Sequence, residues 1–323
     1  MRTRLEADDR KKRELGGRRR DASEDNTDEV INRTEYGGSI PVDNVQALAS
    51  KDPKDVPVRY IRPEIESEEV LADESLQIPV IDISKNSPRL DNLIRGSSRH
   101  ISAIIMSFVI NQRFEKCEQL VNHGISEAID AMKKVTEEFF KLPLDEKMKY
   151  AQLPNTIEGY GQAFVLSEEQ KLDWGDMLFL IPLPVPLRNL RFWPQNPNSF
   201  RDTFDEYSNK LYGVSKKLFE LISINLGIEP ETICKMIDFE NCTQGIRMNY
   251  YPVYPPCPEA RKVLGKTPHS DATGLTLLVQ VNEVQGLQMK KNSKWVPIKP
   301  IPGSIIVNIG DVLEVINYQK HVV

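Results

Sequence analysis

Apolar residues recur every three or four positions in two long stretches of the chain. The first is residues 126–142, SEAIDAMKKVTEEFFKL, where this spacing predicts an amphipathic helix that ends before Pro143. The second is residues 202–228, which predict a longer helix of the same kind. A shorter helix is expected within residues 39–50, with Asp43 as its N-terminal cap.

Shorter apolar runs, separated by Gly, Pro or Asn, follow a strand-like pattern. Residues 76–84 (LQIPVIDIS) predict one strand, and residues 172–186 (LDWGDMLFLIPLPVP) predict another that leads into a proline-rich loop. After about Thr243 the runs GIRMNYYPVYP, GLTLLVQV, LQMKK, WVPIKPI and SIIVNIGDVLEVI follow one another as predicted strands. Their regular spacing favours a β-sandwich or jelly roll over a βαβ sheet, so helices come first and a compact β-region follows.

Composition is that of a soluble globular protein with a sizeable core: 323 residues, 40% hydrophobic and 28% charged. The net charge of −5 indicates neither a nucleic-acid nor an anionic-membrane partner. The longest apolar stretch, residues 101–110, covers roughly half a bilayer span, and residues 1–35 contain no apolar core of a secretory signal. We expect a cytoplasmic monomer without a membrane partner.

The cysteines support a reducing compartment, because Cys117, Cys234, Cys242 and Cys257 form no CxxC pair and are too few for a disulfide scaffold. Residues 1–35 hold ten Lys or Arg and ten Asp or Glu. Their run RKKRELGGRRR is compatible with a nuclear-localisation or polyanion-binding patch. The interleaved acidic residues favour a solvated, disordered tail instead.

Candidate chemistry centres on KTPHSDATGLTLLVQ, residues 266–280, in which His269 and Asp271 stand two positions apart. In an extended segment such residues project from the same face, so both side chains can reach one ion. An imidazole with a carboxylate suits Fe(II), Mn(II) or Zn(II). The pair alone is a weak signal, but Pro268, Gly274 and the strand that follows place it at the mouth of a barrel, where small-barrel sites occur.

Several motifs together resemble the plant-type 2-oxoglutarate- and Fe(II)-dependent dioxygenases, in particular the codeine O-demethylase, anthocyanidin synthase and flavonol synthase group. They are RMNYYPVYPPCP, TPHSDATGLTLLVQ and GLQMKKNSKWVPIKPIPGSIIVNIGDVLEVI, with IPVIDIS, QLVNHGI, EGYGQAFVLSEEQKLDWGDMLFL and FWPQNP upstream. The resemblance covers roughly residues 37–316 apart from one gap. It implies an α+β fold, with an N-terminal helical region and a double-stranded β-helix (jelly-roll) core.

The resemblance also implies the chemistry of the site. His269 and Asp271 would bind Fe(II) together with a distal His, and Asn249 and Tyr251 would donate hydrogen bonds to the cosubstrate 2-oxoglutarate. O2 is the second cosubstrate, and ascorbate is a further cofactor that the family admits. Decarboxylation of 2-oxoglutarate would accompany hydroxylation, demethylation or desaturation of a small apolar or aromatic metabolite, such as a flavonoid or an alkaloid.

Some residues have plainer interpretations. If the resemblance is set aside, Tyr251 is interpreted as a core aromatic residue. Arg247 fits an ion-paired surface position better than a place in the cavity. His123 in VNHGI is expected in a structural turn rather than at a metal, and His100 on the surface. Core or domain-packing positions are expected for the three tryptophans, Trp174, Trp193 and Trp295.

The family pattern continues past GDVLE to the distal His and to an R-x-S pair for the far carboxylate of 2-oxoglutarate. Here the sequence reads GDVLEVINYQKHVV, where His321 is a poor match for the third ligand because the surrounding motif is missing. We therefore expect a jelly roll without its last strands. An inactive fragment or pseudoenzyme that binds a small molecule or a partner is the alternative to an enzyme. NYYP and HSDATGLT in this order disfavour an unrelated jelly-roll metal protein.

The expected organisation has four parts. They are a disordered charged tail at 1–36, an N-terminal dioxygenase domain at 37–190 with an atypical insert at about 89–118, a helical connection at 191–241, and an incomplete jelly-roll domain at 242–323. We attribute the insert, the C-terminal residues and the charged tail to mis-spliced or mis-predicted exons.

Overall fold

A computed structural model describes residues 39–51, 56–67, 78–86, 117–154, 156–162, 164–253, 258–282, 284–291 and 294–321. The predicted tail at 1–36, His100 and nearly all of the predicted insert lie outside these ranges, so those interpretations stay predictions. Among the residues described, no helix combines the length and apolar character needed to cross a bilayer. Cys117, Cys234 and Cys242 form no disulfide within the described ranges, and Cys257 lies outside them.

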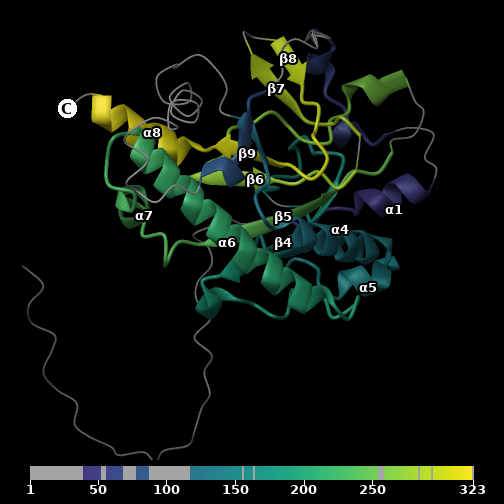
Figure 1. The fold of residues 1–323 in the computed structure, drawn as a ribbon. Coiled ribbons are helices and arrows are strands. Elements are labelled where there is room, and N and C mark those ends of the chain that lie inside the picture. The colour runs from purple at the N-terminus through teal and green to yellow at the C-terminus, as the bar shows by residue number, and fades with distance from the viewer. Residues whose placement is uncertain are drawn as a thin grey trace, which may run out of the picture.

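The described strands form two larger sheets and a hairpin (Figure 1). The four-stranded sheet runs, in spatial order, β1 (Val80–Asp82), β2 (Cys117–Val121), β9 (Ile305–Ile309) and β6 (Leu275–Leu278). The three-stranded sheet runs β3 (Gly159–Gly161), β4 (Asp176–Leu183) and β5 (Gln244–Tyr250). The hairpin pairs β7 (Gln288–Lys291) with β8 (Lys294–Pro297). Every pairing is antiparallel except that of β1 with β2.

Helices flank these sheets (Figure 1). The α-helices are α1 (Val45–Ser50), α4 (Ser126–Lys141), α5 (Leu144–Met148), α6 (Phe200–Asn225), α7 (Thr232–Met236) and α8 (Asp311–His321). Short 3-10 turns lie between them: η2 (Val58–Tyr60), η3 (Pro63–Ser67), η4 (Ile83–Asn86), η5 (Val185–Leu187) and η6 (Pro258–Lys262). The two helices predicted from periodicity are confirmed as α4 and α6.

One apolar cluster joins both larger sheets to α4 and α6. The predicted face of α4 is buried in it, with Phe139 fully covered and Ile129 nearly so. Leu120 of β2 and Leu178 of β4 enter the same cluster from the two sheets. Strands from early and late parts of the chain therefore share one core, since β2 pairs with β9 and β4 pairs with β5.

Three local predictions are wrong in detail. Asn44, not Asp43, caps α1, because its Oδ1 lies 2.7 Å from the backbone N of Ala47. The strand expected over residues 76–84 is only the short β1, and η4 follows it. The segment DVLEVI forms the first part of α8 rather than a strand, since the chain turns at Gly310 and its next N–H groups donate to a neighbouring loop.

A long-range carboxylate ties α1 to the three-stranded sheet. Asp176 in β4 is 2% exposed, and its two carboxylate oxygens accept hydrogen bonds of 2.8 Å from the backbone N–H groups of Val45 and Gln46. These N–H groups belong to the first turn of a helix, which has no backbone acceptors of its own. Burial raises the pKa of Asp176, and the two hydrogen bonds oppose that effect.

We predict that Asp176→Ala lowers the free energy of unfolding by about 2–4 kcal/mol, because it leaves the buried N–H of Val45 and the partly buried N–H of Gln46 without an acceptor. Asp176→Asn keeps one acceptor oxygen and should cost less. Urea denaturation measures both, with Asp130→Ala on the exposed face of α4 as the matched control, expected within about 0.5 kcal/mol of the wild type. Equal stability of Asp176→Ala and the control would contradict this role.

Candidate metal centre

Residues 266–274 form an irregular loop that leads into β6, and hydrogen bonds fix both of its ends. At the start, the backbone N–H of Thr267 donates to Asp173 Oδ1 over 2.9 Å, and the Thr267 hydroxyl donates to the same oxygen. At the far end, carbonyls of the loop accept hydrogen bonds from the chain entering α8: Asp311 N to Asp271 O at 2.9 Å, Gly310 N to Gly274 O at 3.0 Å and Val312 N to Thr273 O at 3.3 Å. The loop carbonyls thus accept hydrogen bonds from the N–H groups at the start of α8, which have no acceptor within the helix.

Gly310 is the point of closest approach between this loop and the turn into α8. A Cβ atom at residue 310 would lie 1.9 Å from the carbonyl oxygen of Thr273 and 2.9 Å from that of Asp271. Both neighbours are backbone atoms, which cannot rotate out of the way. Only glycine fits here while the loop keeps its conformation.

His269 and Asp271 converge, although they lie in a loop and not in the extended segment that the sequence predicts. His269 Nε2 is 3.3 Å from Asp271 Oδ1. His269 Nδ1 lies 2.8 Å from the carbonyl oxygen of Thr267. Because a carbonyl only accepts, Nδ1 carries a proton, and Nε2 is the nitrogen left to bind a cation.

Electrostatics at the pair follow from this arrangement. In the charged form of the imidazole, Nε2 carries a proton as well and donates it to Asp271 Oδ1. This contact lowers the pKa of Asp271 to about 2 and raises the pKa of His269, and a metal ion at Nε2 would take the place of that proton. Asn308 of β9 holds the other carboxylate oxygen, with Nδ2 3.4 Å from Asp271 Oδ2. One nitrogen and one oxygen donor, both oriented by neighbouring groups, fit two positions of a divalent transition-metal ion.

A third ligand is not found among the side chains that the structure describes, where no group of three His, Cys, Asp or Glu residues could hold a metal. His321, the candidate from the sequence, is the last residue of α8. That helix starts beside the loop and has 11 residues, so its far end is about 15 Å away along the axis. The backbone of His321 is therefore carried away from the pair.

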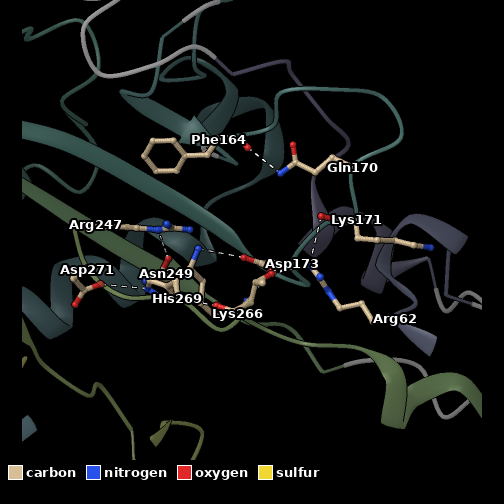
Figure 2. A network of polar contacts seen from close by, with 11 residues as sticks. Arg62, Phe164, Gln170, Lys171, Asp173, Arg247, Asn249, Lys266, His269 and Asp271 are labelled. Carbon is tan, nitrogen blue, oxygen red and sulfur yellow. Dashed lines mark hydrogen bonds and ion pairs between the residues drawn. The ribbon is translucent and has the colours of Figure 1, made fainter. Parts of the chain in front are cut away.

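A row of side chains on β5 and just beyond it lies beside the pair (Figure 2). Arg247, Asn249 and Tyr251 alternate onto one side of the chain and line a small cavity together with Asp173. Arg247 Nε donates to Asn249 Oδ1 over 2.7 Å. Arg247 is only partly exposed and desolvation lowers its pKa, so the predicted surface position is wrong. The predicted ion pair stays a prediction, since no carboxylate among the described residues pairs with it.

Tyr251 is 50% exposed, so the alternative that it is a core aromatic is also wrong. Its ring rests against two glycines, because a Cβ atom at Gly175 would lie 2.8 Å from Cδ1 of the ring and one at Gly265 would lie 3.0 Å away. Desolvation raises the pKa of the hydroxyl, and the charge of Arg247 acts in the opposite direction. The glycines keep the ring in its place at the cavity.

Asp173 joins the loop to the rest of the protein and was not predicted from the sequence. Its carboxylate lies 3.4 Å from Arg62 Nη2 and 3.3 Å from Lys266 Nζ (Figure 2). Arg62 Nη2 also donates to Thr267 Oγ1 over 2.7 Å.

Beside this network is a cleft of about 350 Å³. Phe164, whose ring is half-exposed and whose backbone φ is 63°, lines it. The only sequence signal for Lys266 and Thr267 is their place next to the H-x-D motif.

The remaining predicted residues have structural roles. His123 follows β2 in a turn, where its Nε2 lies 2.8 Å from the carbonyl oxygen of Gly303, which confirms the structural interpretation. Trp174 and Trp193 are buried core residues, as predicted. Trp295 is only partly buried on the hairpin, with the amine of Lys290 5.2 Å from its ring centroid.

Comparisons with known proteins agree on one family. Residues 242–322 match the 2OG-Fe(II) oxygenase superfamily, and residues 78–196 match the N-terminal region of the non-haem dioxygenases in morphine synthesis. S-norcoclaurine synthase 1 of Coptis japonica is 49% identical, covering 88% of this chain and 78% of its own length. Codeine O-demethylase of Papaver somniferum is 36% identical over 86% of this chain and 76% of its own.

Among solved structures, JOX2 in complex with 2OG, Fe and JA is similar with a TM-score of 0.71. It is 34% identical in sequence, and the match covers 85% of this chain and 75% of that one. The likeness confirms the predicted α+β fold with a double-stranded β-helix core.

We predict that Gly310→Ala lowers both stability and metal affinity, because the added methyl group must displace the loop carbonyls that surround it. The loss of unfolding free energy should be about 2 kcal/mol or more, as for other forced overpacking. Gly286→Ala is the control, since a Cβ atom there has no neighbour within 4 Å. Thermal unfolding and Mn(II) titration of both variants test this. A Gly310→Ala protein with the melting temperature and Mn(II) affinity of the wild type would exclude the close contact between residue 310 and the Thr273 carbonyl.

Proposed function

Because the chain belongs to the plant 2-oxoglutarate- and Fe(II)-dependent dioxygenase family, we propose that it is an oxidoreductase acting on a small apolar or aromatic metabolite. Fe(II) and 2-oxoglutarate are the cofactor and cosubstrate of this family. Hydroxylation, demethylation or desaturation of an alkaloid-like or flavonoid-like molecule is the proposed reaction. The names of the relatives, which include a codeine O-demethylase and a flavonoid 7-O-demethylase, support that substrate class.

The observation that carries the proposal is the 3.3 Å approach of His269 Nε2 to Asp271 Oδ1. These two atoms would hold Fe(II). When bound, Fe(II) supplies the open coordination positions at which O2 and the keto acid react. The Thr267 carbonyl keeps the proton on Nδ1 of His269, and Asn308 fixes the Asp271 carboxylate, so neither ligand has to reorient before a metal binds.

Asn249 and Tyr251 would bind the cosubstrate. Since Arg247 donates to the amide oxygen of Asn249, that oxygen is occupied and the NH2 group of the same side chain is left as a donor. The hydroxyl of Tyr251 makes no hydrogen bond to any residue that the structure describes, and the same cavity borders it. Both groups are therefore available to donate to a carboxylate or keto oxygen.

A second candidate function is a small-molecule-binding protein without turnover. The observation in its favour is that the described side chains supply two metal ligands rather than three. Two ligands bind a divalent ion much more weakly than three. Iron binding therefore separates the two candidates before any substrate is known.

The deciding experiment is an anaerobic titration of the purified chain with Fe(II) and 2-oxoglutarate, followed through the weak visible charge-transfer band of the chelated keto acid. We expect the band in the wild type. His269→Ala and Asp271→Asn should weaken metal binding by more than about 100-fold, since loss of an outer-shell partner alone costs about 10- to 100-fold. Asp130→Asn is the control. A folded wild type that gives no band would favour the non-catalytic candidate.

We further predict that Tyr251→Phe raises the Kd for 2-oxoglutarate by about 5- to 10-fold, the effect of losing one hydrogen bond of about 1 kcal/mol. Fe(II) affinity should stay unchanged, because the hydroxyl is not a proposed ligand. Tyr212→Phe on α6, where the ring packs against Phe239, is the matched control. Equal Kd values for the two variants would remove Tyr251 from the cosubstrate site.

A further inference from the structure

We propose that Gln162 and Phe164 determine which substrates the cleft beside the candidate metal centre accepts, and that they select a neutral, planar aromatic molecule with an acceptor oxygen. The inference rests on the proposed function, because it takes the His269–Asp271 pair as the reacting centre. It narrows the alkaloid-like and flavonoid-like substrates to oxygenated aromatic molecules without a positive charge. Four features support it: the size of the cleft, a buried donor without an acceptor, the charges of the cleft wall and a strained aromatic residue.

The cleft adjoins the loop that holds the metal-binding pair. Thr267 lines it, and the carbonyl oxygen of this residue lies 2.8 Å from Nδ1 of His269. The volume of the cleft is about 350 Å³, whereas a cavity of about 150 Å³ takes one benzene ring. The cleft therefore has room for a molecule of about two fused rings with a small substituent.

Gln162 supplies a donor that lacks an acceptor. Its side chain lines both the cleft and the small cavity beside Tyr251, and only 8% of the residue is exposed. Nε2 of its amide is buried and makes no hydrogen bond to any residue that the structure describes. The Tyr60 hydroxyl lies beside the same amide, and burial raises the pKa of Tyr60 to about 12, so it stays a protonated phenol. Such a phenol can donate to the amide oxygen, which leaves the NH2 group unused.

This unused NH2 group favours a ligand that accepts from it. A buried donor without an acceptor costs about 1–3 kcal/mol. The terminal torsion of a glutamine is soft, so a small rotation of the Gln162 amide turns the NH2 group toward an oxygen in the cleft. A carbonyl or ether oxygen at this place would recover the cost of the missing hydrogen bond.

The other polar side chains of the cleft wall also offer donors. Arg62 Nε is buried and makes no hydrogen bond within the described part of the chain, while Nη2 of the same side chain pairs with Asp173. The amine of Lys171 donates to a backbone carbonyl over 2.8 Å, and that of Lys266 pairs with Asp173. Among the described residues that line the cleft, three cations thus accompany one carboxylate. A ligand with an ammonium group is therefore disfavoured, and one with an acceptor oxygen is favoured.

Phe164 supplies an aromatic face. Its backbone φ of 63° lies in the left-handed region, which costs a residue with a side chain about 1–2 kcal/mol. Gln170 holds this conformation, because its amide donates to the Phe164 carbonyl over 2.9 Å (Figure 2) and accepts from the Leu166 N–H over 2.7 Å. The ring stays 49% exposed at the cleft. Strain held in this way is typical of ligand sites, and an exposed ring gains energy by stacking on a planar aromatic molecule.

Equilibrium dialysis of the full chain without metal tests the proposal with three naphthalene probes of nearly equal size. They are 2-acetylnaphthalene, 2-isopropenylnaphthalene and 1-(2-naphthyl)ethylamine, which carry a carbonyl oxygen, a methylene group in its place and an ammonium group. We expect the wild type to bind the ketone about 5- to 10-fold more tightly than the alkene, the effect of one hydrogen bond of about 1 kcal/mol. The ammonium probe should bind at least about 10-fold more weakly than the ketone.

Variants of the two residues separate their roles. Gln162→Leu removes the donor, and Gln162→Met removes it while keeping the length of the side chain, so both should bind ketone and alkene equally. Gln195→Leu, at an exposed position, is the control and should keep the wild-type preference. Phe164→Ala should weaken the binding of both probes by about 2- to 10-fold and leave their ratio unchanged. Leu166→Ala, an exposed neighbour in the same loop, should change neither.

A ketone preference that survives in both Gln162 variants would overturn the proposal, as would an ammonium probe that binds as tightly as the ketone. Equal affinities of Phe164→Ala and Leu166→Ala would remove the aromatic face, and a wild type that binds none of the probes would remove the cleft as a substrate site. The dialysis contains no metal, so these outcomes do not depend on iron binding. A missing Fe(II) charge-transfer band with the ketone preference intact would count against the oxygenase alone.

Discussion

The carboxylate of Asp173 is the constraint on which the geometry of the site depends. It joins three segments that are far apart in the sequence: Arg62 after η2, the residues leading into β4, and Lys266 with Thr267 at the start of the metal loop. Thr267 in turn sets the orientation of His269 through its carbonyl. Without that anchor, His269 would have neither a fixed position nor a fixed tautomer, and the row on β5 would face an unstructured loop.

The other end of the loop depends on α8, and the dependence is mutual. The first N–H groups of that helix need acceptors, and the loop carbonyls need donors because the loop precedes the first ladder pair of β6 at Leu275. Each satisfies the other, and Gly310 lets the two backbones approach closely enough to do so. The Ser270 hydroxyl adds a hydrogen bond of 2.9 Å to the Asp311 carboxylate. The stability of α8 and the shape of the candidate metal centre are thus coupled.

Much of the fold could be predicted from local pattern. The periodic stretches became α4 and α6, and the short apolar runs after Thr243 became β5 to β9, because side-chain burial and backbone period are encoded within a few residues. The H-x-D pair and the NYYP residues were also visible, since motif and resemblance both point to them. Asp173, Arg62 and Asn308 were not, because their contacts join residues up to 205 positions apart. Arg247 was misjudged for the same reason, since its desolvation depends on folded neighbours.

The supports of the His269–Asp271 pair exist independently of any metal. Asp173, Thr267, Asn308 and α8 hold the two side chains through contacts that contain no ligand atom. A pair held this firmly loses little conformational entropy when a cation binds, so the affinity of these two ligands for a cation is higher than that of a mobile pair.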